Sequence, residues 1–127
     1  MSIIPEDLKY TKEHEWVRID GGVATIGVTD YAQHEAGDIV FLELPKVGAS
    51  VSQGQAIGVL ETVKSVSDIY SPISGTVAEV NAPLAATPEN INKDAYSNWV
   101  CKITSSKAAE LEGLLSAMAY AQLVGEA

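Results

Sequence analysis

The sequence predicts one mainly β domain in which two pseudo-symmetric β-sheets pack face to face, as a sandwich or a flattened barrel. Short segments alternate apolar and polar side chains and are separated by glycine, proline and aspartate, which is typical of strands joined by turns. The length of 127 residues suits one domain with one core, so residues 1–127 are expected to form a single unit. A third observation, an internal repeat, accounts for the two sheets.

The first predicted element after a short N-terminal extension is a β-hairpin. Residues 15–19 and 23–28 each alternate in the manner of a strand. Asp20-Gly21-Gly22 lies between them and supplies the positive φ angles that a tight hairpin turn requires. The two segments are therefore expected to pair with each other.

A short helix is predicted next, over residues 30–36. Thr29 precedes it, and a threonine at this position caps a helix by accepting a hydrogen bond from a backbone N–H group of the first turn. Gly37 follows it, and glycine readily adopts the left-handed conformation in which many helices end.

Residues 37–103 contain the internal repeat, and each copy reads as strand, turn, short strand and strand. Two copies are too few for a solenoid, so we expect them to pack against each other with approximate two-fold symmetry. Equivalent turns follow the two copies, but only the first of these turns carries a lysine, Lys64. The matched segments are 37–45 with 75–83, 51–55 with 91–95, and 57–61 with 99–103.

The C-terminal segment, residues 104–127, is predicted to be helical. Ser105 or Ser106 can cap its start, and Gly113 allows a break into a second short helix. An apolar stripe at helical spacing is expected to pack against the sheets. Its members are Leu111, Leu114, Leu115 and Met118.

Composition excludes several classes of function. Eight lysines and arginines against 17 aspartates and glutamates give a net charge of −9, which disfavours nucleic acid as a partner. No apolar run approaches the roughly 20 residues of a membrane span, and the acidic N-terminus is not typical of a signal or transit peptide. The single cysteine, Cys101, cannot form an internal disulfide and is expected to be buried in a strand. These features predict a cytoplasmic protein.

Lys64 lies at the tip of a predicted hairpin. The tip, Thr62-Val63-Lys64-Ser65, lacks the Asn-Gly or Asp-Gly pair that hairpin turns prefer, and departures from a local rule tend to mark functional sites. Glu61 and Asp68 flank the lysine and could hold its ammonium group charged and solvated. The plain alternative is an exposed lysine that discourages edge pairing. The repeat, the unusual turn and the flanking carboxylates favour a lysine that carries an attached group.

Residues 61–75 resemble the lipoyl-lysine segment of the glycine cleavage H-protein family. Gly48 and Gly75 stand before and after Lys64 at spacings similar to those of lipoyl domains in general. The resemblance extends in order over nearly the whole chain. Further matching segments are 8–10, 14–17, 24–29, 37–41, 43–45 and 91–96, followed by Trp99 and by Lys102-Ile103.

The resemblance implies a lipoyl-domain-like barrel-sandwich hybrid with residues 37–103 as its pseudo-symmetric core. Lys64 would carry lipoate in amide linkage, as N6-lipoyl-lysine, after modification by lipoate-attaching enzymes. Four further residues would shape the tip or its recognition: Glu61, Asp68, Gly48 and Gly75.

The implied role is that of a non-catalytic carrier in glycine catabolism and one-carbon metabolism. The P protein, a pyridoxal-phosphate glycine decarboxylase, would load an aminomethyl group onto the lipoyl arm. The T protein, an aminomethyltransferase, would pass the one-carbon unit to tetrahydrofolate, and the L protein, dihydrolipoamide dehydrogenase, would reoxidise the arm. A monomer is expected, because the tip has to reach several active sites.

In the family the loaded arm folds back into a cleft on the protein surface. The resemblance places Glu15 and Asp68 near that cleft and His14 beside it, with Glu15 offering a carboxylate to the carried amine. A solvated strand carboxylate is the alternative interpretation of Glu15. His34 and Glu35 receive no role, and no Cys/His cluster with the spacing of a metal site is present.

Four other functions remain open from the sequence. A biotinyl domain usually has methionines beside its lysine, whereas Val63 and Ser65 flank Lys64. A lipoyl domain of a 2-oxoacid dehydrogenase complex is shorter and normally tethered by a linker. An enzyme using Lys64 as a Schiff-base nucleophile would need a desolvated lysine, which a wet, acidic tip disfavours. A lipoate relay that donates lipoyl groups to other carrier domains would use the same Lys64.

Overall fold

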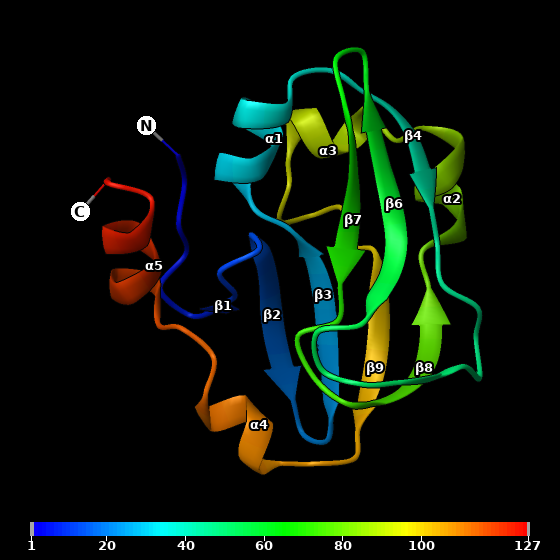
Figure 1. Cartoon of the computed structure of the whole chain (residues 1–127), viewed down its shortest axis with the longest axis vertical. Helices are drawn as coiled ribbons and strands as arrows, with labels where there is room; N and C mark the ends of the chain where they lie inside the picture. The colour runs from blue at the N-terminus through cyan, green and yellow to red at the C-terminus, as the bar shows by residue number, and fades with distance from the viewer. Residues whose placement is uncertain (1, 127) are drawn as a thin grey trace.

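The computed structural model describes residues 2–126 and shows a mainly β fold built from two antiparallel sheets (Figure 1). The larger sheet has six strands in the order β1-β2-β3-β9-β8-β5, and the smaller has three in the order β4-β6-β7. The strands of the larger sheet are β1 (Lys9–Tyr10), β2 (Glu15–Asp20), β3 (Val23–Val28), β9 (Cys101–Ser105), β8 (Gly75–Val80) and β5 (Ser50–Val51). The strands of the smaller sheet are β4 (Ile39–Glu43), β6 (Ala56–Thr62) and β7 (Val66–Tyr70).

Five short helices connect or follow the strands within residues 2–126. None of them is long and apolar enough to cross a membrane. They are α1 (Asp30–Ala36), α2 (Ala82–Ala86), α3 (Asn90–Lys93), α4 (Ala109–Glu112) and α5 (Ala117–Leu123).

The predicted hairpin and first helix are confirmed. Strands β2 and β3 pair along their whole length, and Gly21 in the turn has a φ of 64°. The side chain of Thr29 accepts a hydrogen bond from the Ala32 N–H group and so caps α1. Gly37 ends α1 with a φ of 83°, a conformation that glycine adopts without steric cost.

The two copies of the repeat differ in their middle sections. The first copy has the predicted short strand, β5, which pairs with β8 of the second copy. The prediction of a short strand at residues 91–95 is wrong, because this part of the second copy forms α3 after α2. Pro83 occupies the first turn of α2, where its missing N–H group costs nothing and its fixed φ suits a helix. The sheets are also unequal, because β1, β2 and β3 extend the edge formed by β9.

The core consists of two clusters of buried side chains. The larger cluster fills the space between the sheets and includes Ile39, Leu60 and the buried Cys101. The smaller cluster contains Leu8, Tyr10, Trp16 and Tyr120, which attach α5 to β1 and β2. The C-terminal helix is therefore held by aromatic packing rather than by the main core.

The C-terminal segment is helical, as predicted, but it begins later. Ser105 ends β9 and α4 has no side-chain cap, so the predicted capping role of Ser105 or Ser106 is wrong. The break after Gly113 is confirmed, and Ser116 caps α5. This break changes the helical phase, so Met118 is 72% exposed instead of continuing the apolar stripe.

Candidate functional site

The turn between β6 and β7 is stabilised by a side chain instead of by a glycine. The Thr62 N–H group donates to the Ser65 carbonyl at 2.8 Å. The Thr62 hydroxyl accepts from the Ser65 N–H group at 3.0 Å and from the Lys64 N–H group at 3.3 Å. No residue of this turn has a positive φ angle. The hydroxyl of Thr62 therefore explains how the chain turns here without the residues that hairpins prefer.

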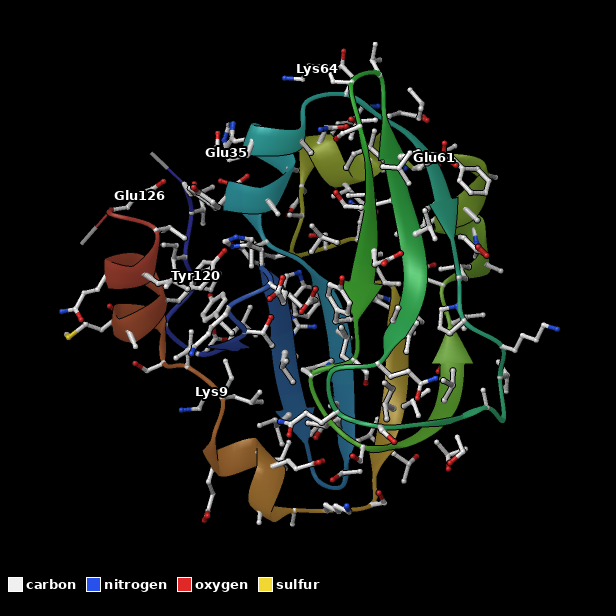
Figure 2. All side chains as sticks on the ribbon, in the orientation of Figure 1. Lys9, Glu35, Glu61, Lys64, Tyr120 and Glu126 are labelled. Carbon is white, nitrogen blue, oxygen red and sulfur yellow. The ribbon has the colours of Figure 1, made fainter. Side chains whose placement is uncertain are left out.

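Lys64 is exposed at the end of this hairpin, and its amine points toward the side of α1 (Figure 2). A Cβ atom placed on Gly37 would lie 3.5 Å from Lys64 Cε, so the lysine chain leans over the end of α1. Among residues 2–126, Lys64 forms no ion pair with Glu61 or Asp68. The structure thus does not bring the two predicted carboxylates to the amine.

The two predicted glycines serve the fold in different ways. Gly48 has a φ of 88° and open space around it, so its backbone conformation is what favours glycine. A side chain at Gly75 would collide with the carbonyl oxygen of Thr104, so its size is what allows β8 and β9 to approach. Both glycines lie outside the cavity described next.

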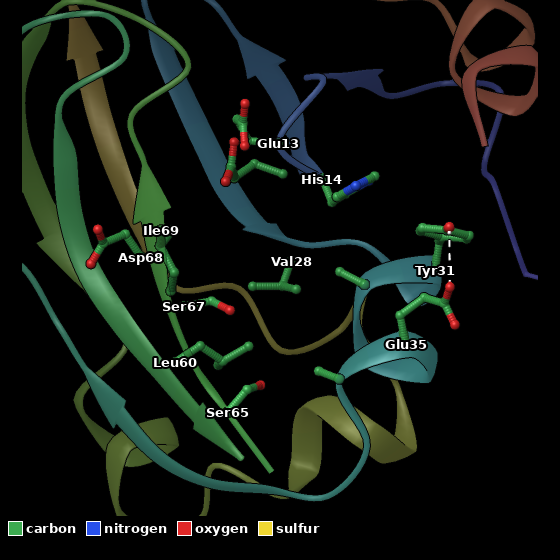
Figure 3. Close-up of a pocket in the computed structure, with 13 residues that line it drawn as sticks. Glu13, His14, Val28, Tyr31, Glu35, Leu60, Ser65, Ser67, Asp68 and Ile69 are labelled. Carbon is green, nitrogen blue, oxygen red and sulfur yellow. Dashed lines mark hydrogen bonds between the residues drawn. The ribbon is translucent and has the colours of Figure 1, made fainter.

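A cavity of about 380 Å³ begins beside the tip and lies between the hairpin and α1 (Figure 3). It contains three residues that the sequence placed near one cleft, Glu15, Asp68 and His14. Its apolar lining is Val28, Ala32, Ala36, Leu60 and Ile69, and its polar lining is Glu13, His14, Glu15, Tyr31, Glu35, Ser65, Ser67 and Asp68. The lining contains no lysine or arginine among the described residues.

Glu15 is the most unusual of these polar groups, because its side chain is buried. The residue is 3% exposed, so the alternative of a solvated strand carboxylate is wrong. Its carboxylate accepts hydrogen bonds from the Thr11 hydroxyl at 2.6 Å and from the Tyr70 N–H group at 3.3 Å. Burial raises the pKa of Glu15 to about 7, against the lowering effect of these hydrogen bonds. A cation in the cavity would therefore favour the ionised carboxylate.

His14 lies beside Glu15 in a strained conformation. Its φ is 74°, which is unusual for a residue other than glycine. Its Nδ1 atom lies 2.8 Å from the Tyr120 hydroxyl, and its ring lies 5.1 Å from that of Tyr31. Burial lowers the pKa of His14, so the imidazole is neutral at neutral pH.

Sequence reasoning missed the contribution of α1 to the cavity. Tyr31 and Glu35 both line it, and the Tyr31 hydroxyl donates to Glu35 Oε1 at 3.2 Å. They stand four residues apart, which places them on one face of the predicted helix. That spacing was the available signal, but nothing in the sequence showed that this face borders a cavity. Glu35 adds a third glutamate to Glu13 and Glu15 in the cavity lining, so the end of the cavity that these residues border is acidic.

Comparison with known proteins identifies the family. Residues 8–127 match the family model described as glycine cleavage H-protein. The chain is 54% identical to the glycine cleavage system H protein of Acidobacterium capsulatum, over 96% of this chain and 95% of that protein. It is 49% identical to that of Carboxydothermus hydrogenoformans, over 99% and 98% of the two chains.

A solved structure gives the same result for the fold. The crystal structure of a glycine cleavage system H protein from Mycobacterium marinum matches with a TM-score of 0.87 and 36% sequence identity. The match covers 96% of this chain and 99% of that one. The predicted lipoyl-domain-like fold is confirmed by this likeness. The chain belongs to the glycine cleavage H-protein family.

Proposed function

We propose that this chain is the lipoyl carrier of a glycine cleavage system and that lipoate is attached through an amide to Lys64. The observation that carries the proposal is an exposed lysine on a hydrogen-bonded turn, directly beside a cavity that contains a buried carboxylate. The family match supports the carrier role. It also disfavours the biotinyl, 2-oxoacid dehydrogenase and Schiff-base alternatives.

The residues of the cavity fit a lipoyl arm. A volume of about 380 Å³ falls within the roughly 300–1,000 Å³ of small-molecule sites. Leu60, Val28 and Ala36 offer apolar contacts to a hydrocarbon chain, while Glu15 and Glu35 suit an amine at its end. When bound, lipoate supplies the sulfur that carries the aminomethyl group.

The tip provides attachment and reach. Lys64 stands in solvent, where a lipoate-attaching enzyme can reach its amine. The hydrogen bonds to Thr62 hold the backbone from which the arm extends. A fixed origin and a flexible arm together raise the effective concentration of the carried group at a partner's active site.

The far end of the cavity, which contains Glu15 and His14, shields the carried amine from water. Glu15 can accept a hydrogen bond from the carried amine and balance its charge, because it is ionised more readily when a cation is near. His14 is neutral and so does not repel that amine. Apolar residues around the arm keep water away from the carried group.

The partners that follow from this role are the P, T and L proteins and the lipoate-attaching enzymes. The net charge of −9 favours partner surfaces that are basic. The chain supplies no catalytic group of its own in this proposal and works as a cytoplasmic monomer. Gly48, Gly75, Glu61 and Asp68 would contribute to recognition of the tip by the modifying enzyme.

The test is the intact mass of the full chain expressed with lipoate, followed by peptide mapping. We expect one lipoyl adduct, on Lys64, and none in the Lys64→Arg variant. An unmodified Lys64 in cells that lipoylate other proteins would contradict the proposal. An adduct on another lysine would contradict the assignment of the site.

A further inference from the structure

Tyr120 is far from the cavity in sequence but touches its wall. It lies on the inner side of α5, fully buried, and stacks on Tyr10 with ring centroids 4.8 Å apart (Figure 2). Its hydroxyl lies 2.8 Å from Nδ1 of His14 and 2.8 Å from Oγ1 of Thr29. One oxygen atom of the C-terminal helix thus contacts two segments that border the cavity.

These two partners lie in different segments of the chain at one end of the cavity. His14 lies in the loop before β2, and Thr29 caps α1, which carries Tyr31 and Glu35. A backbone hydrogen bond from Thr29 N–H to the His14 carbonyl, 3.0 Å long, already joins the two chains. That bond does not fix the imidazole ring, which can turn about its side-chain torsions. Among the described residues, the Tyr120 hydroxyl is the hydrogen-bond partner of the ring.

The hydrogen bonds around Tyr120 also bear on the tautomer of His14, because one arrangement of hydrogens satisfies them all. Thr29 Oγ1 accepts from the Ala32 N–H group, and its own hydrogen can be donated to the Tyr120 oxygen. Tyr120 can then donate its hydrogen to His14 Nδ1. This arrangement uses every hydroxyl hydrogen once and leaves the imidazole proton on Nε2.

We propose that Tyr120 is a positioning residue for the cavity, whose hydroxyl holds the His14 imidazole against Tyr31 with its proton on Nε2. The C-terminal helix thereby closes the end of the cavity at which the carried amine is shielded. This inference rests on the proposed carrier function. It assigns to α5 a role in retaining the aminomethyl group that is separate from attachment at Lys64.

The experiment uses the lipoylated full chain and its Tyr120→Phe variant, which keeps the stacked ring and removes only the hydroxyl. Nitrogen NMR of His14 should show a single Nε2-protonated tautomer in the wild type and a mixture in the variant. The second readout is the release of formaldehyde and ammonia from aminomethyl-loaded protein after removal of the loading enzyme. We expect release to be about three- to tenfold faster in the variant, as the loss of one buried hydrogen bond predicts.

Tyr10→Phe is the matched control. Tyr10 is equally buried in the same cluster, but its hydroxyl donates to the Pro5 carbonyl at 2.6 Å and does not contact His14. Its removal should leave the tautomer of His14 and the release rate unchanged. Thr29→Ser, which keeps the hydroxyl partner of Tyr120, should also behave as the wild type.

A wild-type tautomer and release rate in Tyr120→Phe would overturn the inference. If that variant does not fold, His14→Asn tests the same contact from the other side, because asparagine tolerates a positive φ angle. An unchanged release rate in His14→Asn would likewise overturn it. If the carrier proposal is wrong, the wild-type protein will acquire no lipoyl group, which is a separate outcome. The NMR measurement on the unmodified protein then still decides whether Tyr120 holds His14.

Discussion

The two ends of the cavity are built in opposite ways. At the tip, most of the hydrogen bonds that order the turn join residues within the four positions 62–65, and one further bond runs from the Val63 N–H group to the Asp38 carbonyl at 3.3 Å. At the far end, Glu15 contacts Tyr70 across 55 positions and His14 contacts Tyr120 across 106. Attachment therefore depends mainly on a local motif, while shielding depends on the completed fold. A change at the tip should alter modification or transfer, and a change at the far end should alter retention or stability.

The largest expected effect is a loss of activity without a loss of stability when Lys64 at the tip is replaced. Lys64→Arg keeps the positive charge but cannot form the lipoyl amide, so the reconstituted glycine cleavage reaction should be abolished. The free energy of unfolding should be unchanged, because Lys64 is exposed and makes no ion pair among the described residues.

Lys46→Arg, at another exposed lysine, is the matched control and should keep full activity. Glycine cleavage by the Lys64→Arg protein would refute the carrier mechanism. Loss of stability in that variant would show that the tip is not as independent of the fold as its local bonds indicate.

The next largest effect is a change of the protein's stability with pH, which Glu15 at the far end of the cavity causes. The pKa of Glu15 is raised in the folded state, from 4.5 to about 7, so the folded protein binds this proton more tightly than the unfolded chain. The contribution of Glu15 to stability is thus full below pH 4.5 and is lost as pH rises to about 7. The complete loss corresponds to about 3 kcal/mol.

Glu15→Gln should remove this pH dependence. Denaturant unfolding of the unlipoylated protein between pH 4 and pH 8 measures it, and the wild type should lose stability over this range relative to the variant. Parallel stability curves for the two proteins would show that Glu15 is ionised without cost in the folded state.

The smallest effect tests whether the turn depends on one hydroxyl. Thr62→Val keeps the shape of the side chain and removes the acceptor for the Lys64 and Ser65 N–H groups. We expect a loss of about 1–2 kcal/mol in the free energy of unfolding, because two modest hydrogen bonds are removed. Lipoylation by the attaching enzyme should be slower, and hydrogen exchange at these two amides faster.

Thr62→Ser retains the hydroxyl and should behave as the wild type in both measurements. Equal exchange rates in Thr62→Val and Thr62→Ser would mean that the strands alone order the tip.

The same contrast explains how much could be predicted from the sequence. Local features were predictable, such as the Thr29 cap, the end of α1 at Gly37 and the exposed tip with Lys64. The internal repeat predicts a short strand at residues 91–95 because they match 51–55, but the segment is too short for its own pattern to distinguish a strand from the helix found there, which buries Ile91 in the core.

The far end was much less predictable. Glu15 and His14 came from the family resemblance, and the burial that raises the pKa of Glu15 is visible only in three dimensions. Glu35 and Tyr120 were not predicted at all. The contact of Tyr120 with His14 spans 106 positions, and no local pattern reports such a contact.

The long separation of His14 and Tyr120 also has a consequence for the order of events during translation. The ribosome releases the N-terminal part of the chain first, and a hairpin such as that of Lys64 closes within about 1–10 μs once its residues are free. The hydrogen bond of His14 can form only after α5, which follows the Lys64 hairpin in the chain, has emerged. The growing chain therefore presents its lysine before the cavity beside it is closed.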